Sequence, residues 1–134
     1  MASLIDTSVW IDVFHSKTSS AIRAAAADAI NRSDAVLCEP VRLELLRGVP
    51  RRDAARIESH IATVPMLPTP PSLWNDALLI LQACTRKGSA VNTMNGLIAT
   101  IAMKHKAVVV SFDHDFLIVQ EVCGLRVEIL GRLK

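Results

Sequence analysis

The first twelve residues of the chain read Met1-Ala2-Ser3-Leu4-Ile5-Asp6-Thr7-Ser8-Val9-Trp10-Ile11-Asp12. A short apolar run ends at Asp6, and two hydroxyl residues then lead into an amphipathic segment. This pattern predicts a buried strand followed by a helix that is capped by Thr7 or Ser8. Because open parallel sheets bind ligands beyond the carboxyl ends of their strands, we expect Asp6 to anchor a metal site to which the fold brings other acidic residues.

The composition is that of one globular domain covering residues 1–134. Of the 134 residues, 51% are hydrophobic and 21% are charged, and a chain of this length buries enough surface to fold without disulfides. No apolar run reaches the roughly 18–20 residues of a membrane span, and the N-terminus has no signal pattern. Three well-separated cysteines, Cys38, Cys84 and Cys123, predict reduced core thiols in a cytoplasmic protein.

The charge is too small to indicate nucleic-acid binding by itself, because the net value is only +2. Five arginines nevertheless fall within the 15 residues from 42 to 56, namely Arg42, Arg47, Arg51, Arg52 and Arg56. Aromatic residues make up only 4% of the chain and there is no tyrosine. A surface that stacks many unpaired bases is therefore excluded.

Apolar periodicity predicts helices that alternate with short apolar strands. The expected helices cover residues 8–15, 21–30, 40–48, 51–62, 73–86, 94–105 and 116–122. After the opening strand, further strands are expected at residues 35–38, 106–112 and 125–130, and the proline-rich segment 64–71 reads as an extended connector or edge strand. Such alternation predicts an α/β fold with a mostly parallel central sheet.

Two of these helices have a predicted apolar stripe that faces the core. In the helix that follows Pro40, the residues expected to point inward are Val41, Leu43, Leu45 and Leu46. In the helix at 73–86, they are Leu73, Ala77, Leu78, Leu81 and Cys84.

The acidic residues stand where strands end and helices begin. Asp6 ends the first strand, Asp113 and Asp115 follow the strongest strand, Glu44 lies in an early turn of its helix, and Asn95 lies in the first turn of another. In a parallel sheet, Asp6 and Asp113 share one edge. Two carboxylates about 5 Å apart repel by roughly 3 kcal/mol at an effective dielectric near 20, so a cation is needed to hold several together. All-oxygen ligands favour Mg²⁺ or Mn²⁺ over zinc and suit phosphate-ester hydrolysis.

Each of these residues also fits a purely structural role. Asp6 can serve as a helix N-cap, and Asp113 and Asp115 can cap the helix that begins near Phe116. Glu44 can pair with a nearby arginine or remain solvated. The arginine run can be an ordinary wet helix face, Ser8 a simple cap and His114 a surface residue.

The arrangement of these residues carries more information than any one of them. Four blocks, in this order and at this spacing, resemble the PIN-domain ribonucleases, and among them the VapC toxins of bacterial and archaeal toxin–antitoxin pairs. The blocks are Asp6-Thr7-Ser8-Val9-Trp10-Ile11, Glu44-Leu45-Leu46-Arg47-Gly48, Asn95-Gly96-Leu97-Ile98-Ala99-Thr100-Ile101-Ala102 and Ser111-Phe112-Asp113-His114-Asp115-Phe116. The resemblance covers essentially the whole chain.

The resemblance implies a PIN-like three-layer α/β/α fold and a Mg²⁺- or Mn²⁺-dependent endoribonuclease toxin that cuts structured cellular RNA, such as transfer or ribosomal RNA. It also implies a homodimer and a cognate VapB-type antitoxin whose C-terminal segment enters the active-site groove. Carried over by position, the family's four acids fall on Asp6, Glu44, Asn95 and Asp113. Ser8 matches a supporting hydroxyl and Asp115 a frequent extra acid.

The expected metal ligands and the expected RNA contacts are different residues, and the RNA contacts are inferred from the charge of the arginine run and not from the resemblance. The expected metal ligands are Asp6, Asn95 and Asp113. Phosphate contacts are expected from Arg47, Arg51 and Arg52.

Asn95 is the departure from the family pattern, which has aspartate at this position. Asparagine is nearly isosteric and offers one neutral oxygen but no charge, so we expect weakened metal affinity and a large loss of activity. The residue is either a deliberate inactivating change or the natural mark of a weak or silent enzyme. The alternative function is a non-catalytic PIN module that binds antitoxin or RNA without turnover.

Two other classes of protein fit poorly. A phosphatase with an aspartyl nucleophile usually needs a second acid where Ser8 stands. A phosphoacceptor receiver domain needs an acidic pair and a late-strand lysine that the chain lacks.

Overall fold

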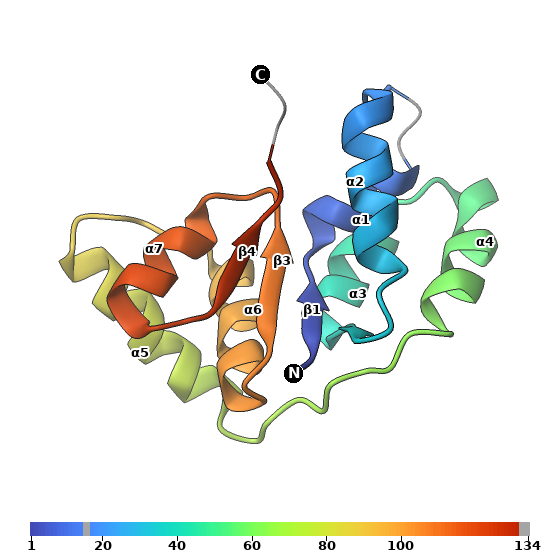
Figure 1. The fold of residues 1–134 in the computed structure, drawn as a ribbon. Helices are drawn as coiled ribbons and strands as arrows, with labels where there is room; N and C mark the ends of the chain where they lie inside the picture. The colour runs from blue at the N-terminus through green and yellow to red at the C-terminus, as the bar shows by residue number, and fades with distance from the viewer. Residues whose placement is uncertain (15–16, 132–134) are drawn as a thin grey trace.

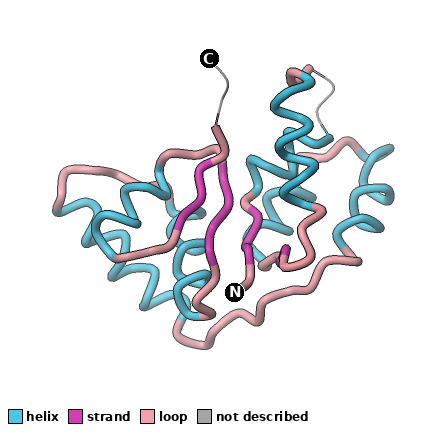
Figure 2. The backbone as a smooth tube through the Cα atoms, in the orientation of Figure 1, coloured by secondary structure: helices cyan, strands magenta, loops and turns pink. Residues whose placement is uncertain are grey.

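In the computed structural model, which describes residues 1–14 and 17–131, a parallel sheet forms the centre of the molecule. Its strands are β1 (Ser3–Ile5), β2 (Ala35–Val36), β3 (Val108–Ser111) and β4 (Val127–Ile129). They are ordered β2-β1-β3-β4, and each neighbouring pair is parallel. Helices lie on both sides of this sheet (Figure 1), whose strands are short beside the helices (Figure 2). The predicted α/β fold with a parallel sheet is confirmed.

The helices begin and end within a few residues of their predicted bounds. They are α1 (Thr7–Phe14), α2 (Ser20–Ile30), α3 (Glu39–Arg47), α4 (Arg51–Ile61), α5 (Leu73–Arg86), α6 (Thr93–Lys104) and α7 (Asp115–Cys123). His15, the last residue of the first predicted helix, lies outside the described residues. The left-handed backbone of Gly124, with φ of 78°, ends α7.

The predicted cap of α1 is wrong by one residue. The helix already begins at Thr7, and the Asp6 carboxylate accepts the Ser8 N–H at 3.4 Å. Asp6 therefore caps the helix in addition to any role it has in a site. The cap of α6 is Asn92, since its side chain accepts the Asn95 N–H at 2.8 Å.

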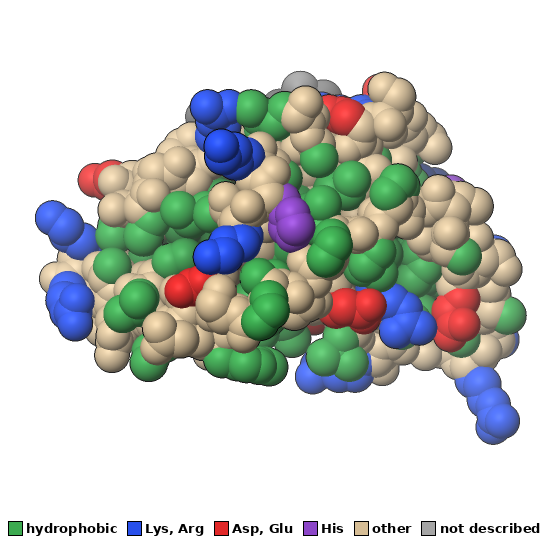
Figure 3. Space-filling model, turned by 90° about the horizontal axis from the view of Figure 1, so that it is seen from below, with side chains coloured by type: hydrophobic (Ala, Val, Ile, Leu, Met, Phe, Trp, Pro, Cys, Tyr) green, Lys and Arg blue, Asp and Glu red, His purple; other side chains and the backbone are tan. Residues whose placement is uncertain are grey.

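The strands predicted at 106–112 and 125–130 are shorter at both ends, and β2 covers only the first two residues of 35–38, because Leu37 pairs with Met66 instead. The connector at 64–71 adds a single bridge between Leu37 and Met66, and it passes below the sheet from α4 to α5 (Figure 1). Figure 3 views the molecule from this side, where hydrophobic side chains lie between scattered charged ones.

The core is continuous from the sheet to the helices on both sides, with Trp10, Ile98 and Phe116 fully buried. Helices α5 and α6 approach closely at Gly96, where an added Cβ would lie 2.6 Å from Leu81 Cδ2. None of the helices in residues 1–14 and 17–131 is both long and apolar enough to span a membrane.

Two residues predicted to face the core do not. Leu43 is 60% exposed because it lies two residues from both Val41 and Leu45, on the opposite side of α3. The buried side of α5 carries Leu73, Ala77 and Cys84. Leu78 comes one residue after Ala77 and so points away from that side, which leaves it 50% exposed. Leu46 and Leu81 are partly buried against the core.

The three cysteines are free, as predicted. Burial raises the pKa of Cys38 to about 12. The thiols of Cys84 in α5 and Cys123 in α7 are hydrogen-bonded to each other, and burial raises the pKa of both.

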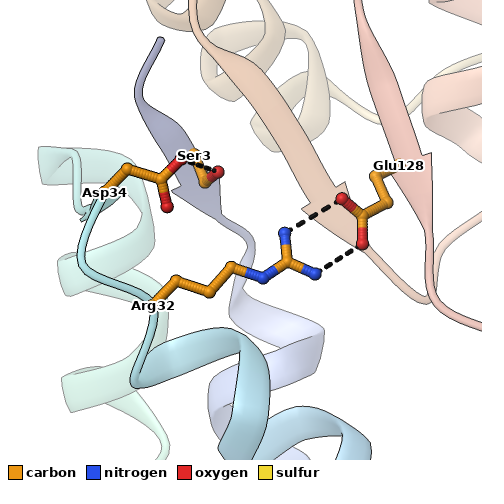
Figure 4. A network of polar contacts seen from close by, with 4 residues as sticks. All are labelled: Ser3, Arg32, Asp34 and Glu128. Atoms are coloured by element: carbon orange, nitrogen blue, oxygen red, sulfur yellow. Dashed lines mark hydrogen bonds and ion pairs between the residues drawn. The ribbon is translucent and has the colours of Figure 1, made fainter.

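A polar network ties the loop between α2 and β2 to strands β1 and β4 (Figure 4). Ser3 Oγ of β1 donates to Asp34 Oδ2 at 2.9 Å. The Arg32 guanidinium donates to both carboxylate oxygens of Glu128 on β4, at 2.9 and 2.5 Å. This ion pair connects the segment before one edge strand with the opposite edge strand, and it holds the pKa of Glu128 below its ordinary value of 4.5.

The Arg32–Glu128 pair predicts a pH-dependent contribution to stability. A carboxylate whose pKa is lowered by folding stabilises the fold above its ordinary pKa, and this contribution is lost as the pH falls through the lowered value. Because both side chains are partly exposed, we expect Glu128→Gln to reduce the free energy of unfolding by about 0.5–1 kcal/mol at pH 7. Urea unfolding at pH 7 and pH 3 measures the difference, which should shrink at pH 3.

The control variant is Glu121→Gln, which removes an exposed charge from α7. It should leave stability nearly unchanged at both pH values. A Glu128→Gln effect that is as large at pH 3 as at pH 7 would contradict the assignment to the ion pair.

Candidate active site

The carboxyl edge of β1 and β3 brings Asp6 to the centre of a polar cluster. Asp6 directly follows β1, and its N–H donates to the carbonyl oxygen of Val110 on β3 at 3.0 Å. The side chain is only 3% exposed. Its Oδ2 atom accepts hydrogen bonds from Ser111 Oγ at 2.7 Å and from Ser8 Oγ at 2.9 Å. Burial raises the pKa of Asp6 above its ordinary value, and the two serine hydrogen bonds offset part of that rise.

Two serines connect the ends of the strands. Ser111 Oγ donates to Asp6 and also accepts the Asp113 N–H at 2.8 Å. Ser8 Oγ accepts the Phe112 N–H at 3.2 Å and lies 3.3 Å from Ser111 Oγ. Sequence reasoning assigned a supporting role to Ser8 but none to Ser111. The available signal was a single hydroxyl at the end of an otherwise apolar strand.

Asn95 joins the two acids that follow β3. It is buried in the first turn of α6. Its Nδ2 atom donates to Asp113 Oδ2 at 3.0 Å and to Asp115 Oδ2 at 3.5 Å. Asp113 Oδ1 accepts the Asp115 N–H at 2.9 Å, which also fixes the start of α7. The amide hydrogens of Asn95 therefore lie against two carboxylates that would otherwise repel each other.

Glu44 reaches the same region from α3, through α1. The Thr7 hydroxyl donates to Glu44 Oε1 at 2.7 Å, and Thr7 is the neighbour of Asp6. In the part of the chain that the structure describes, Glu44 forms no ion pair with Arg47 or Arg51. The sequence suggested Thr7 only as a cap, so its contact with Glu44 is a second feature that sequence reasoning missed.

The remaining candidates lie on the surface. Arg47, Arg51 and Arg52 are exposed, and Arg52 approaches Asp53 at 4.0 Å. His114 is exposed at the N-terminus of α7. Exposed arginines suit both a solvated helix face and contacts with phosphates, so their positions are compatible with either role.

The side chains fit a hard divalent cation by atom type but only weakly by charge. The candidate ligands Asp6, Asn95 and Asp113 offer oxygen atoms, which Mg²⁺ and Mn²⁺ prefer. Within residues 1–14 and 17–131, however, no three His, Cys, Asp or Glu side chains are grouped closely enough to hold a metal ion. An amide stands where a third ionised ligand would complete the set, and its Nδ2 atom points at the carboxylates.

The chain was compared with known proteins. It is 28% identical over 127 residues to VapC ribonuclease Mb1587 of Mycobacterium bovis and to ribonuclease VapC11 of Mycobacterium tuberculosis, which covers 92% of this chain and 95% of each relative. Its fold is similar to a chain in the crystal structure of DNA-bound VapBC from Salmonella typhimurium, with a TM-score of 0.76, 23% identity and coverage of 96% and 98%. The sequence matches the PIN domain over residues 3–122, so this chain belongs to the PIN domain family.

Proposed function

We propose that this chain is a VapC-type endoribonuclease, the toxin of a type II toxin–antitoxin pair. The observation that carries the proposal is the convergence of Asp6, Asp113 and Asn95 at one edge of a PIN-domain sheet. Relatives named VapC ribonucleases support it along nearly the whole chain.

In the proposed reaction, Asp6, Asn95 and Asp113 would hold Mg²⁺ or Mn²⁺. A bound divalent ion activates water and stabilises charge on a phosphoryl group. The protein's own contribution is to orient these ligands. Ser8 and Ser111 fix the Asp6 carboxylate, and the Asn95 amide fixes Asp113.

The remaining polar residues act around this centre. Glu44, positioned by Thr7, and Asp115 supply two further carboxylates. Arg47, Arg51 and Arg52 contact phosphates of the RNA strand.

The proposal includes a substrate and two protein partners. The substrate is structured cellular RNA, such as transfer or ribosomal RNA. The partners are a VapB-type antitoxin and a second copy of this chain, which act together in the cytoplasm. The similarity to a chain from a VapBC complex supports the antitoxin as a partner.

A non-catalytic PIN module is the second candidate function, and one contact favours it. The Asn95 amide relieves the repulsion between Asp113 and Asp115 by hydrogen bonding, so this pair does not need a cation for stability. Such a chain would bind antitoxin or RNA without cleaving it. Metal binding and turnover after a single substitution distinguish the two functions.

Asn95→Asp should strengthen metal binding and raise RNA cleavage with Mn²⁺. The new carboxylate would face Asp113 and Asp115 at hydrogen-bond range, where repulsion is on the order of 4 kcal/mol before protonation relieves it. We therefore expect the variant to melt at a lower temperature without metal and to recover with Mn²⁺. Thermal melting and cleavage of a labelled RNA measure the two effects.

Asn92→Asp is the matched control, because it adds the same charge at the cap of the same helix, on an exposed residue. A carboxylate at this cap is favourable, so melting should not become more dependent on metal. If Asn95→Asp gains neither cleavage nor metal-dependent stability, the assignment of this position is wrong.

Asp6→Asn should stabilise the metal-free protein at neutral pH. Because the pKa of Asp6 in the folded protein is raised above 3.8, the folded state holds a proton on Asp6 at pH values where the unfolded state has lost it. The free energy of unfolding therefore falls as the pH rises from 3.8 through the raised value. Asparagine removes this penalty and can still accept the two serine hydrogen bonds.

The measurement is the melting temperature without metal at pH 4 and pH 7. The difference between variant and parent should grow toward pH 7, and the variant should lose any stabilisation by Mg²⁺. A variant that is less stable at pH 7 than at pH 4, relative to the parent, would contradict this reading of Asp6.

Replacing Arg47, Arg51 and Arg52 together with alanine should weaken RNA binding and flatten its salt dependence. Each phosphate contact to a single strand contributes about 0.7 to the slope of log K against log salt, so three contacts predict a change of about 2. Fluorescence anisotropy at several salt concentrations measures the slope. The control replaces Lys104, Lys106 and Arg126, which precede β3 and β4 at the opposite edge of the sheet. If both triple variants show the same slope, the three arginines are an ordinary solvated helix face and do not contact RNA phosphates.

A further inference from the structure

A pocket of about 200 Å³ opens beside Glu44, between α1, α3 and α4. The residues that line it are mainly apolar, and the charged residues Asp53 and Arg56 of α4 also line it. Glu44 lines this pocket and also accepts the Thr7 hydroxyl next to Asp6, so it connects the pocket with the candidate active site. The volume is below the range of about 300–1,000 Å³ typical of drug-sized ligands, so it suits one small planar group.

Phe14 provides an aromatic wall in this pocket. The Arg56 guanidinium carbon lies 5.4 Å from the centroid of its ring. Trp10 stacks on the ring, with 6.5 Å between centroids and 10° between the planes, and His60 meets it edge-on at 5.8 Å, so neighbouring rings fix its orientation. The Arg56 side chain is 62% exposed, which lets it rotate to admit a flat group.

Phe14 is singular among the five aromatic residues of the chain. Trp10, Phe112 and Phe116 are buried, and Trp74 is exposed on α5. Phe14 alone among the five both lines a pocket and adjoins the candidate active site. A chain with few aromatics thus has one ring placed where a strand would leave the acidic residues.

We propose that this pocket binds a single unpaired base of the RNA strand whose phosphate lies at the acidic site. The inference rests on the proposed function and specifies how that site recognises its substrate. The base stacks on Phe14, with the Arg56 guanidinium over its other face. Such base–aromatic stacking and arginine cation–π contacts are common in the recognition of single strands.

The surrounding charges fit a nucleic acid. The charged residues that line the pocket are Glu44, Asp53 and Arg56, and Arg47, Arg51 and Arg52 flank it from the end of α3 and the start of α4. The arginines match the phosphates on either side of the bound base. The two carboxylates match the amino groups on the edge of a base, and carboxylates accept hydrogen bonds from such groups.

The test uses a fluorescein-labelled single-stranded RNA and a set of copies, each with one abasic nucleotide at a successive position. Binding to the full-length chain is measured by fluorescence anisotropy with Mg²⁺ present. One position should lose roughly 5- to 100-fold in affinity, as expected for the loss of one stacked base. In Phe14→Leu, the intact RNA should bind more weakly, and the loss at that position should fall to the level of the other positions.

Two further variants separate stacking from damage to the fold. Phe14→Tyr keeps the ring and should restore the position-specific loss. Trp74→Leu removes an exposed aromatic residue elsewhere and should leave the profile of the parent unchanged. Circular dichroism melting of Phe14→Leu checks that the variant is folded.

The possible results discriminate clearly. If the parent binds every abasic RNA with the same affinity, the inference is wrong. It is also wrong if the position-specific loss of affinity persists in Phe14→Leu. Either result leaves the nuclease proposal intact. If Phe14→Leu weakens binding only to an apolar antitoxin peptide and not to RNA, the pocket is a protein subsite and the inference is wrong. Failure of the parent to bind any RNA contradicts the proposed function itself.

Discussion

The parallel pairing of β1 with β3 is the constraint on which the candidate site depends. Ile5 pairs with Val110 in this register, so Asp6 emerges next to the end of β3, and its N–H donates to the Val110 carbonyl. The residues that follow β3 therefore meet the residue that follows β1. A slip of one residue would turn the side chains of the strand to the opposite face and separate Asp6 from Ser111.

The register also explains how a buried carboxylate is tolerated. Removing Asp6 from water raises its pKa, and an unpaired buried charge is costly. The hydroxyls of Ser8 and Ser111 supply hydrogen bonds from both strand ends, and Ser111 passes the connection to the Asp113 backbone. These hydrogen bonds of Asp6, Ser8 and Ser111 are thus part of the fold, because they also join β1, β3 and the start of α7.

Much of this arrangement could be predicted from the sequence, because strand–helix alternation and acids at strand ends are local patterns. The positions of Asp6, Asp113 and Asn95 follow from them. The contacts of Ser111 with Asp6 and of Thr7 with Glu44 could not, since each joins residues far apart in the chain. Leu43 was misplaced for a related reason, because hydrophobicity alone does not say which side of a helix meets the core.

Asn95 determines the electrostatics around the two acids that follow β3. Its Nδ2 atom donates to Asp113 and Asp115. The partial positive charge of the amide hydrogens therefore lies against these two carboxylates, where a cation would otherwise be needed to offset their repulsion. The amide therefore lowers the repulsion between these two carboxylates in the metal-free protein. Ser8 and Ser111 hold the Asp6 carboxylate, and the Asn92 cap fixes the backbone of Asn95. Under the proposed function, the difference between a nuclease and a binding module therefore lies in this single side chain.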